Sequence, residues 1–104
     1  MKKLHEVYQP CIEACLKCSV ECEHCATACL MKSSFQNIQK RIQHCIDCAQ
    51  ICLTSIPFMS RGSTYAKEIC NLCAQICDAC AKECARFQDE HCQQCAEACR
   101  KMAM

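Results

Sequence analysis

The cysteines of this chain recur at intervals of three and four residues, which is the spacing of core positions on an amphipathic helix. All seventeen fall into four blocks, and within each block the gaps of three and four alternate without exception. The blocks are Cys11, Cys15, Cys18, Cys22, Cys25 and Cys29; Cys45, Cys48 and Cys52; Cys70, Cys73, Cys77, Cys80 and Cys84; and Cys92, Cys95 and Cys99. This pattern predicts four helices, each with thiols along one face.

The rest of the composition also favours helices. The chain has one glycine, two prolines and no tryptophan, which poorly suits a turn-rich β architecture. We predict an all-α fold with helices near 11–31, 34–56, 64–87 and 90–102, and residues 1–104 forming one domain. Because the links are short, the helices should form an antiparallel up-down-up-down four-helix bundle with a cysteine-lined core.

Helix-breaking and capping residues lie between the blocks. Ser33 followed by Gln36 has the pattern of a capping box at the start of the second helix. Pro57 is expected to end or kink that helix, and Gly62 to lie in the following turn. Asp89 is expected to cap the last helix.

Apolar residues continue the cysteine stripes towards the helix ends: Tyr8, Ile38, Phe87 and Met102. The opposite faces are polar, and the following residues are expected to point outward: Glu13, Lys17, Glu21, Glu23, Lys82, Glu83 and Arg86. Both sets support the same register, in which sulfur lines most of the bundle axis.

The short last helix predicts which cysteines share a level. One half of the bundle should contain Cys92, Cys95 and Cys99 beside Cys84, Cys80 and Cys77 and beside Cys29, Cys25 and Cys22. The other half should contain Cys11, Cys15, Cys18, Cys48, Cys52, Cys70 and Cys73. Cys45 is expected near the join between the two halves.

Charge and compartment exclude several functions. The net charge of +1 gives no electrostatic footprint for nucleic acid or an anionic membrane, and no apolar run is long enough to span a bilayer. The first residues lack the apolar segment of a secretory signal, so we expect a cytoplasmic protein with reduced thiols. An odd number of cysteines also argues against a disulfide scaffold.

A core made of thiols indicates a soft metal, because leucine would contribute more burial energy at the same positions. Zn(II) in a four-thiolate site leaves two negative charges, and Arg41, near the edge of its stripe, is the one candidate counter-charge. Cu(I) at about one ion per thiolate is close to neutral. The sequence therefore favours several Cu(I) ions per chain, bound by all seventeen cysteines.

Other functions remain as alternatives. A zinc or general soft-metal buffer would use four converging ligands, which a regular stripe supplies only at some levels. A thiol-disulfide redox protein would use a C-x-x-C pair, although no βαβ context is visible. The loop motifs of iron–sulfur proteins are missing, as are catalytic triads and phosphate-binding loops, so we do not expect an enzyme.

The four blocks, with "EICNLCAQICDACAKEC" at 68–84 and "DEHCQQCAEAC" at 89–99, resemble the bacterial four-helix-bundle copper storage proteins, and specifically their cytosolic branch. The resemblance covers nearly the whole chain. It implies a homotetramer of four-helix bundles that stores Cu(I) without catalytic turnover. A copper chaperone or copper enzyme is the expected donor or acceptor. This chain departs from the pattern in having only three cysteines in each of its second and fourth blocks.

Four further residues are candidates for metal uptake or auxiliary ligation. His91 precedes Cys92 at one mouth of the bundle, where the similar family motif also carries a histidine. His5, Met59 and Met102 are expected to cluster at the other mouth. The two remaining histidines, His24 and His44, are expected to be solvated side chains rather than ligands.

Overall fold

The computed structural model describes residues 7–31 and 38–103, and this part of the chain consists of four α-helices without a strand. They are α2 (Gln9–Leu30), α3 (Ile38–Ser60), α4 (Ala66–Cys84) and α5 (Glu90–Ala103). None of them combines the length and the apolar character needed to cross a membrane.

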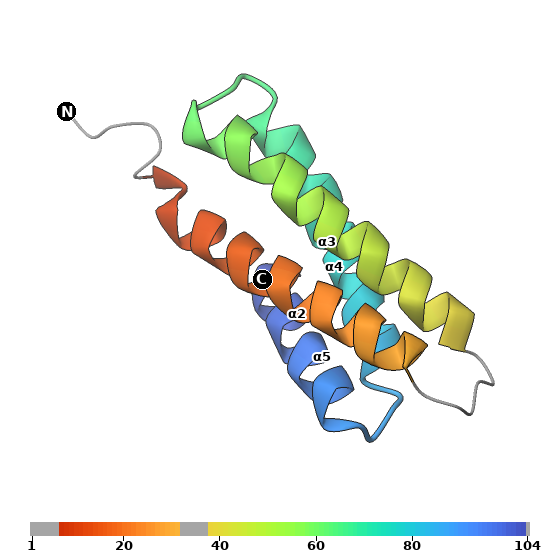
Figure 1. Cartoon of the computed structure of the whole chain (residues 1–104). Helices are drawn as coiled ribbons and strands as arrows, with labels where there is room; N and C mark the ends of the chain where they lie inside the picture. Colours follow the sequence, from red (N-terminus) through yellow and green to blue (C-terminus); the bar gives the residue numbers. More distant parts are fainter. Residues whose placement is uncertain (1–6, 32–37, 104) are drawn as a thin grey trace.

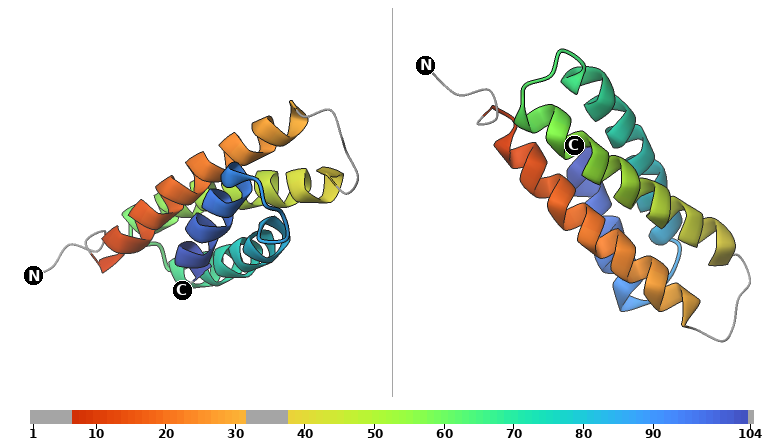
Figure 2. Two further views of the ribbon diagram at one scale, coloured as in Figure 1. Left: turned by 90° about the horizontal axis from the view of Figure 1, so that it is seen from below. Right: turned by 45° about the horizontal axis from the view of Figure 1, so that its top comes forward.

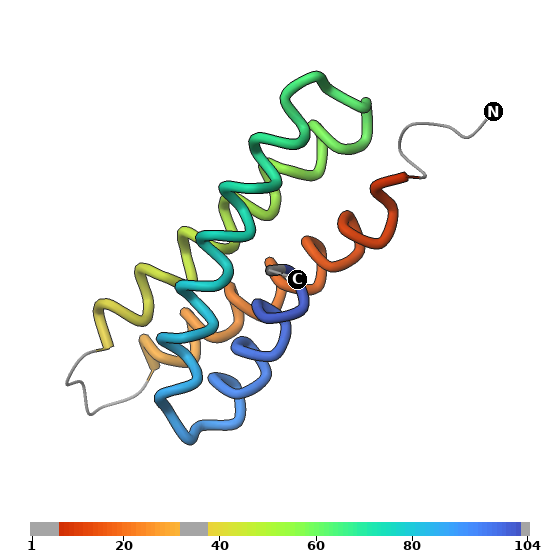
Figure 3. The backbone as a smooth tube through the Cα atoms, turned by 180° about the vertical axis from the view of Figure 1, so that it is seen from behind, coloured from red at the N-terminus to blue at the C-terminus, as the bar shows by residue number. Residues whose placement is uncertain are grey.

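The helices form an elongated bundle in which chain neighbours run in opposite directions (Figure 1). Each helix packs on the next one in sequence, and α5 returns to pack on α2, so the four helices enclose a common axis. The predicted antiparallel four-helix bundle is therefore confirmed. With 14 residues, α5 is much shorter than α2 or α3, and it ends part-way along the bundle (Figures 2 and 3).

Pro57 was expected either to end or to kink the second helix, and the structure shows that the helix does not end there. α3 continues through Pro57 to Ser60. Proline removes one helical hydrogen bond, that to the carbonyl of Leu53, and both residues lie on the exposed face, where water can solvate that carbonyl. The predicted capping residues of this helix, Ser33 and Gln36, lie outside the described residues.

A tight turn connects α3 to α4. Gly62 adopts a left-handed conformation with φ 61°, as expected for a glycine that follows a helix. The hydroxyl of Ser63 accepts a hydrogen bond from the backbone N–H of Tyr65 at 3.0 Å. The helix begins at Ala66 and ends at Cys84, so it is shorter at both ends than the predicted 64–87.

The last helix begins one residue after Asp89, as expected. The main-chain carbonyl of Asp89 accepts hydrogen bonds from the N–H groups of Cys92 and Gln93, both at 3.0 Å. This first turn brings His91 and Cys92 to the end of the bundle where α2 finishes and α3 begins.

The predicted inward register is confirmed for the cysteines. All except Cys11 and Cys70 are fully buried, and these two are partly exposed. Ile38 and Met102 are buried, and Tyr8 and Phe87 pack against the core. The core therefore consists mainly of sulfur, with apolar side chains towards the ends.

Glu83 corrects the predicted polar surface. It was expected to point outward, but only 5 % of it is exposed. Its Oε1 accepts a hydrogen bond from Arg86 at 3.1 Å and lies 3.9 Å from Nζ of Lys40. Because Lys40 belongs to the first turn of α3, the packing of α3 against α4 covers this flank. Helical spacing alone does not reveal such coverage.

Candidate metal centre

The thiols form a continuous path through the bundle. All seventeen cysteines are free, and many of their sulfur atoms lie between 3.2 and 4.0 Å from a sulfur on another helix. Cys18 has sulfur neighbours on all four helices: Cys22 at 3.9 Å, Cys48 at 3.4 Å, Cys77 at 4.0 Å and Cys99 at 3.6 Å. An ion in this interior can thus move from ligands on one helix to ligands on another while staying coordinated by sulfur atoms.

Several sets of four side chains converge closely enough to hold one ion. In each set the ligand atoms lie within 4.8 Å of one another. The sets include Cys18/Cys48/Cys52/Cys77, Cys18/Cys22/Cys48/Cys99, Cys22/Cys80/Cys95/Cys99, Cys25/Cys45/Cys84/Cys95 and Cys25/Cys29/His91/Cys92. Because several cysteines belong to two sets, thiolates can bridge neighbouring ions.

The predicted levels are correct at the end near α5's first turn. Cys92 lies 3.9 Å from Cys25, and Cys95 lies 3.7 Å from Cys84. Cys45 was expected at the join between the halves, but it contacts Cys84 and Cys95 within the half that contains α5.

The join instead contains Cys18 and Cys48, which were expected in the other half. Both contact Cys99, at 3.6 and 3.7 Å. The difference is a shift along the bundle axis between α5 and the helices that it packs on, and the packing of the four helices selects this shift.

His91 completes the set of ligands at one mouth of the bundle. Its Nδ1 lies 3.4 Å from Sγ of Cys25 and 3.5 Å from Sγ of Cys92. Its Nε2 lies 3.4 Å from Oδ2 of Asp89, which favours the proton on Nε2 and leaves the Nδ1 lone pair directed at the thiols. The ring of His24 packs edge-on against that of His91, with 6.3 Å between centroids.

Arg41 is the functional residue that sequence reasoning misplaced. It was assigned to the edge of its stripe, yet it is 5 % exposed and its guanidinium donates to Sγ of Cys92 at 3.3 Å. The guanidinium also stacks 3.7 Å above the ring of Phe87. A signal was present, because Arg41 stands three residues after Ile38 and four before Cys45, in the same register as the cysteines.

Two of the three residues predicted for the second mouth, Met59 and Met102, belong to the buried core. Met102 lies against Cys15, with 3.2 Å between Sδ and Sγ, in the second turn of α2. Met59 is fully buried in the last turn of α3. His5 lies outside the described residues. Of the other histidines, His24 is exposed and His44 half-buried.

Thiol acidity differs along the bundle. Burial raises the pKa of Cys92 to about 11, against the opposing charge of Arg41, and burial also raises that of Cys70 to about 11. A hydrogen bond from the thiol of Cys15 lowers the pKa of the partly exposed Cys11 to about 7. Of the two partly exposed cysteines, Cys11 is therefore the one with the larger thiolate fraction at neutral pH.

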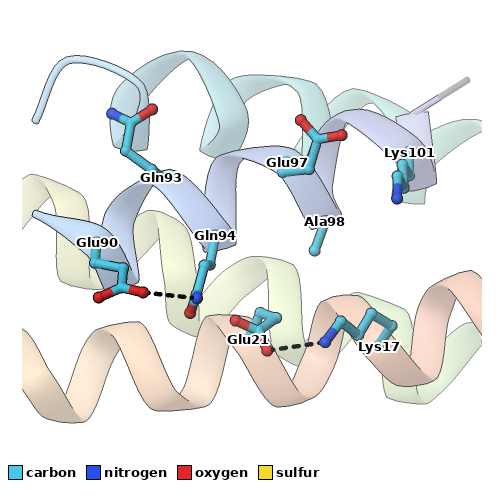
Figure 4. A pocket seen from close by; sticks show the side chains of 8 residues that line it. All are labelled: Lys17, Glu21, Glu90, Gln93, Gln94, Glu97, Ala98 and Lys101. Carbon is cyan, nitrogen blue, oxygen red and sulfur yellow. Dashed lines mark hydrogen bonds and ion pairs between the residues drawn. The ribbon is translucent and has the colours of Figure 1, made fainter. Parts of the chain in front are cut away.

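The outer surface offers a different environment. A groove between α2 and α5 is lined by charged and amide side chains that partly pair with one another, as in the Lys17–Glu21 ion pair at 3.2 Å and the Gln94–Glu90 hydrogen bond at 3.4 Å (Figure 4). No thiol lines this groove, so it is not suited to a soft metal.

A four-helix bundle whose interior is lined by free thiols belongs to the class of soft-metal-binding bundles. The sequence matches the copper storage protein family over residues 4–104, and the chain belongs to this family. The predicted resemblance is thereby confirmed.

Individual relatives agree with this assignment. The Cu(I)-bound copper storage protein BsCsp3 has 43 % sequence identity and a TM-score of 0.89, over 92 % of this chain and 91 % of its own. A cytosolic copper storage protein from Streptomyces lividans, in a structure with five coppers, has 38 % identity and a TM-score of 0.89, over 95 % and 88 % of the two chains. An uncharacterized cysteine-rich protein of Bacillus subtilis, YhjQ, is 42 % identical over 96 % of this chain and 99 % of its own length.

Proposed function

We propose that this protein stores copper by binding several Cu(I) ions along the thiol-lined interior of its bundle. The observation that carries the proposal is the continuous path of sulfur atoms, in which Cys18 alone approaches sulfurs on all four helices. Cu(I) binds two or three soft ligands, so neighbouring ions can share thiolates along this path. Relatives with the same fold bind Cu(I), and one of them binds five coppers.

Charge supports Cu(I) over a divalent ion for most of the interior. The four-cysteine sets are fully buried, and Arg41 is the only buried cation among the described residues. A divalent ion in such a set leaves two uncompensated negative charges, which is costly in a dry core. One Cu(I) ion per thiolate leaves almost no net charge in the core. We therefore assign all seventeen cysteines as Cu(I) ligands, with His91 and Met102 as auxiliary ligands at the positions described above.

The inferred role is storage rather than catalysis. Family membership supports this role, and in the described part of the chain the interior offers sulfur ligands rather than a paired acid and base. We infer that the protein works in the cytosol, as the Streptomyces relative does, and exchanges copper with a chaperone or a copper enzyme.

We also propose that the bundles assemble as a homotetramer. Large apolar side chains remain exposed on the outer faces of α2 and α3, among them Leu16, Val20, Ile46 and Leu53. Burying them between chains would remove apolar surface from water. Light scattering on the purified protein should give four times the chain mass, and a monomer would contradict the proposal.

The storage proposal is tested by anaerobic titration of the reduced protein with Cu(I) in the presence of a competing chelator. Many equivalents should bind per chain before the chelator takes up copper. The same protein with its thiols alkylated is the control and should bind none tightly. Saturation of the unmodified protein at one or two ions would contradict storage.

A further inference from the structure

We propose that in the copper-free protein the side chains of Cys25, Cys29, His91 and Cys92 form a site for one Zn(II) ion, although the same residues serve as Cu(I) ligands once copper is loaded. These four residues, called the mouth cluster below, lie where the end of α2 meets the start of α5. The inference does not depend on the proposed copper storage, because it concerns the protein without copper.

The first argument is ligand type and geometry. Three cysteines and one histidine are an established ligand set for tetrahedral zinc. With Zn–S near 2.3 Å and Zn–N near 2.0–2.1 Å, the edges of the tetrahedron are about 3.8 Å between sulfurs and about 3.6 Å between sulfur and nitrogen. The corresponding distances here are 3.9 Å for Cys25–Cys92, and 3.4 and 3.5 Å from Nδ1 of His91 to the two sulfurs. Three of the four ligand atoms are therefore already close to the positions that the ion requires, and Sγ of Cys29 lies within 4.8 Å of each of them.

The second argument is charge. Zn(II) with three thiolates leaves one negative charge, and the Arg41 guanidinium contacts Cys92 at 3.3 Å and supplies one positive charge. Zn(II), the three thiolates and Arg41 thus sum to zero, and the further carboxylate near the site, that of Asp89, is partly exposed to water. The four-cysteine sets deeper in the bundle would keep two negative charges, and no other cation is buried in the described residues. Charge therefore selects this set for a divalent ion.

The third argument is the support around the histidine. A zinc-bound histidine commonly donates its second N–H to a carboxylate, which orients the ring and raises its basicity. Asp89 holds this position, with Oδ2 3.4 Å from Nε2 of His91. His91 is only 13 % exposed, so the site is screened from water while remaining reachable from the bundle end.

Titration of the reduced, metal-free chain with Co(II) and Zn(II) tests the site. One Co(II) per chain should bind with the absorption bands of a tetrahedral thiolate site, and one Zn(II) per chain should displace it. The absence of tetrahedral Co(II) bands would overturn the inference. So would zinc saturating near four ions per chain, which would indicate that any four thiols suffice. Either failure leaves the Cu(I) titration unaffected.

Two variants identify the residues. His91→Ala should weaken Zn(II) binding by at least about tenfold, whereas His44→Ala, which removes a half-buried histidine elsewhere, should not. Arg41→Met should also weaken it by about tenfold or more through the lost counter-charge, without lowering the stability of the metal-free fold. The matched control is Arg61→Met, because Arg61 is exposed but also stacks on an aromatic ring, that of Phe58.

Unchanged zinc affinity in His91→Ala would overturn the assignment. If this variant fails to fold, as circular dichroism would show, the wild-type chain loaded with cadmium decides the question. The ¹¹³Cd resonance of the bound ion distinguishes three sulfurs and one nitrogen from four sulfurs. A four-sulfur signal would contradict the mouth cluster.

Discussion

At the scale of single residues, thiols of one chemical type differ because their surroundings differ. Cys18 has sulfur on every side, Cys92 has a guanidinium at 3.3 Å, and Cys11 is partly exposed beside Cys15. Acidity and access therefore vary along the bundle, although the spacing in the sequence is uniform. Reactivity can show this variation directly.

We predict that Cys11 is alkylated at least about 100-fold faster than Cys92 in the copper-free protein at pH 7. The pKa of Cys11 is lowered to about 7, so about half of it is thiolate, whereas burial raises that of Cys92 to about 11. Mass spectrometry of peptides after timed alkylation measures both rates.

The denatured chain serves as the control, in which the two rates should converge. Loading with copper should abolish the fast reaction of Cys11, because the thiolate becomes a ligand. Fast alkylation that persists in the loaded protein would favour the redox alternative, in which this thiol acts outside metal storage.

At the scale of the helix, the three-four register determines which residues enter the core, whatever their type. In α3 this register places Arg41 and Ser55 in line with the cysteines, and Ser55 is fully buried. The Ser55 hydroxyl donates a hydrogen bond to the carbonyl of Ile51 at 2.7 Å. Hydrogen bonds from Cys15 and other thiols lower the pKa of Cys73, and the Ser55 hydroxyl makes a smaller contribution in the same direction. Its position is thus suited to a further thiol.

Ser55→Cys is expected to raise the Cu(I) capacity by about one equivalent, because it adds a thiolate beside Cys73. Chelator-competed titration measures the gain. Ser60→Cys is the matched control, since Ser60 is exposed in the same helix and should add no tight binding. Equal capacities of Ser55→Cys and the wild type would contradict the register argument.

The turn between α3 and α4 depends on one glycine. Gly62→Ala should lower the free energy of unfolding by about 1–2 kcal/mol, because φ is 61° and a Cβ is disfavoured there. Denaturant unfolding of the metal-free protein measures the change. Gly62→Asn should lose less, since asparagine tolerates this conformation, and an unchanged alanine variant would show that the turn can rearrange.

At the scale of the whole molecule, the bundle combines two kinds of stability. The metal-free form packs neutral thiols as small apolar groups, whereas metal would cross-link helices that are distant in sequence. The stability of the metal-free form depends on pH, because burial raises the pKa of some of its thiols. Cys70 and Cys92 both rise from 9.0 to about 11 on burial.

We predict that the metal-free protein loses stability as the pH rises from about 9 to 11. In this range these two thiols are deprotonated in the unfolded chain but protonated in the folded one, so the unfolded state binds fewer protons and the free energy of unfolding falls. Thermal unfolding at several pH values measures the effect. The copper-loaded protein, with thiolates already formed, should unfold at a higher temperature and show little of this dependence.

A metal-free protein equally stable at pH 9 and 11 would contradict this explanation. A copper-loaded protein no more stable than the metal-free form would contradict cross-linking.

The cysteine spacing by itself determined the helices and their inward faces, because the residues that share a face three and four apart are set by local backbone geometry. It also placed the cysteines inward and indicated a soft metal. It did not predict that Glu83 is covered by α3, or that Arg41 contacts Cys92.

Tertiary structure decided which sulfurs meet. Cys45 lies with Cys84 and Cys95, and Cys18 and Cys48 meet Cys99, because the helices are offset along the bundle axis in a way that the repeat does not encode. The period is the same at every turn, so it is equally compatible with several axial offsets between helices. Only the packing of the four helices against one another selects the offset, and with it the ligand sets.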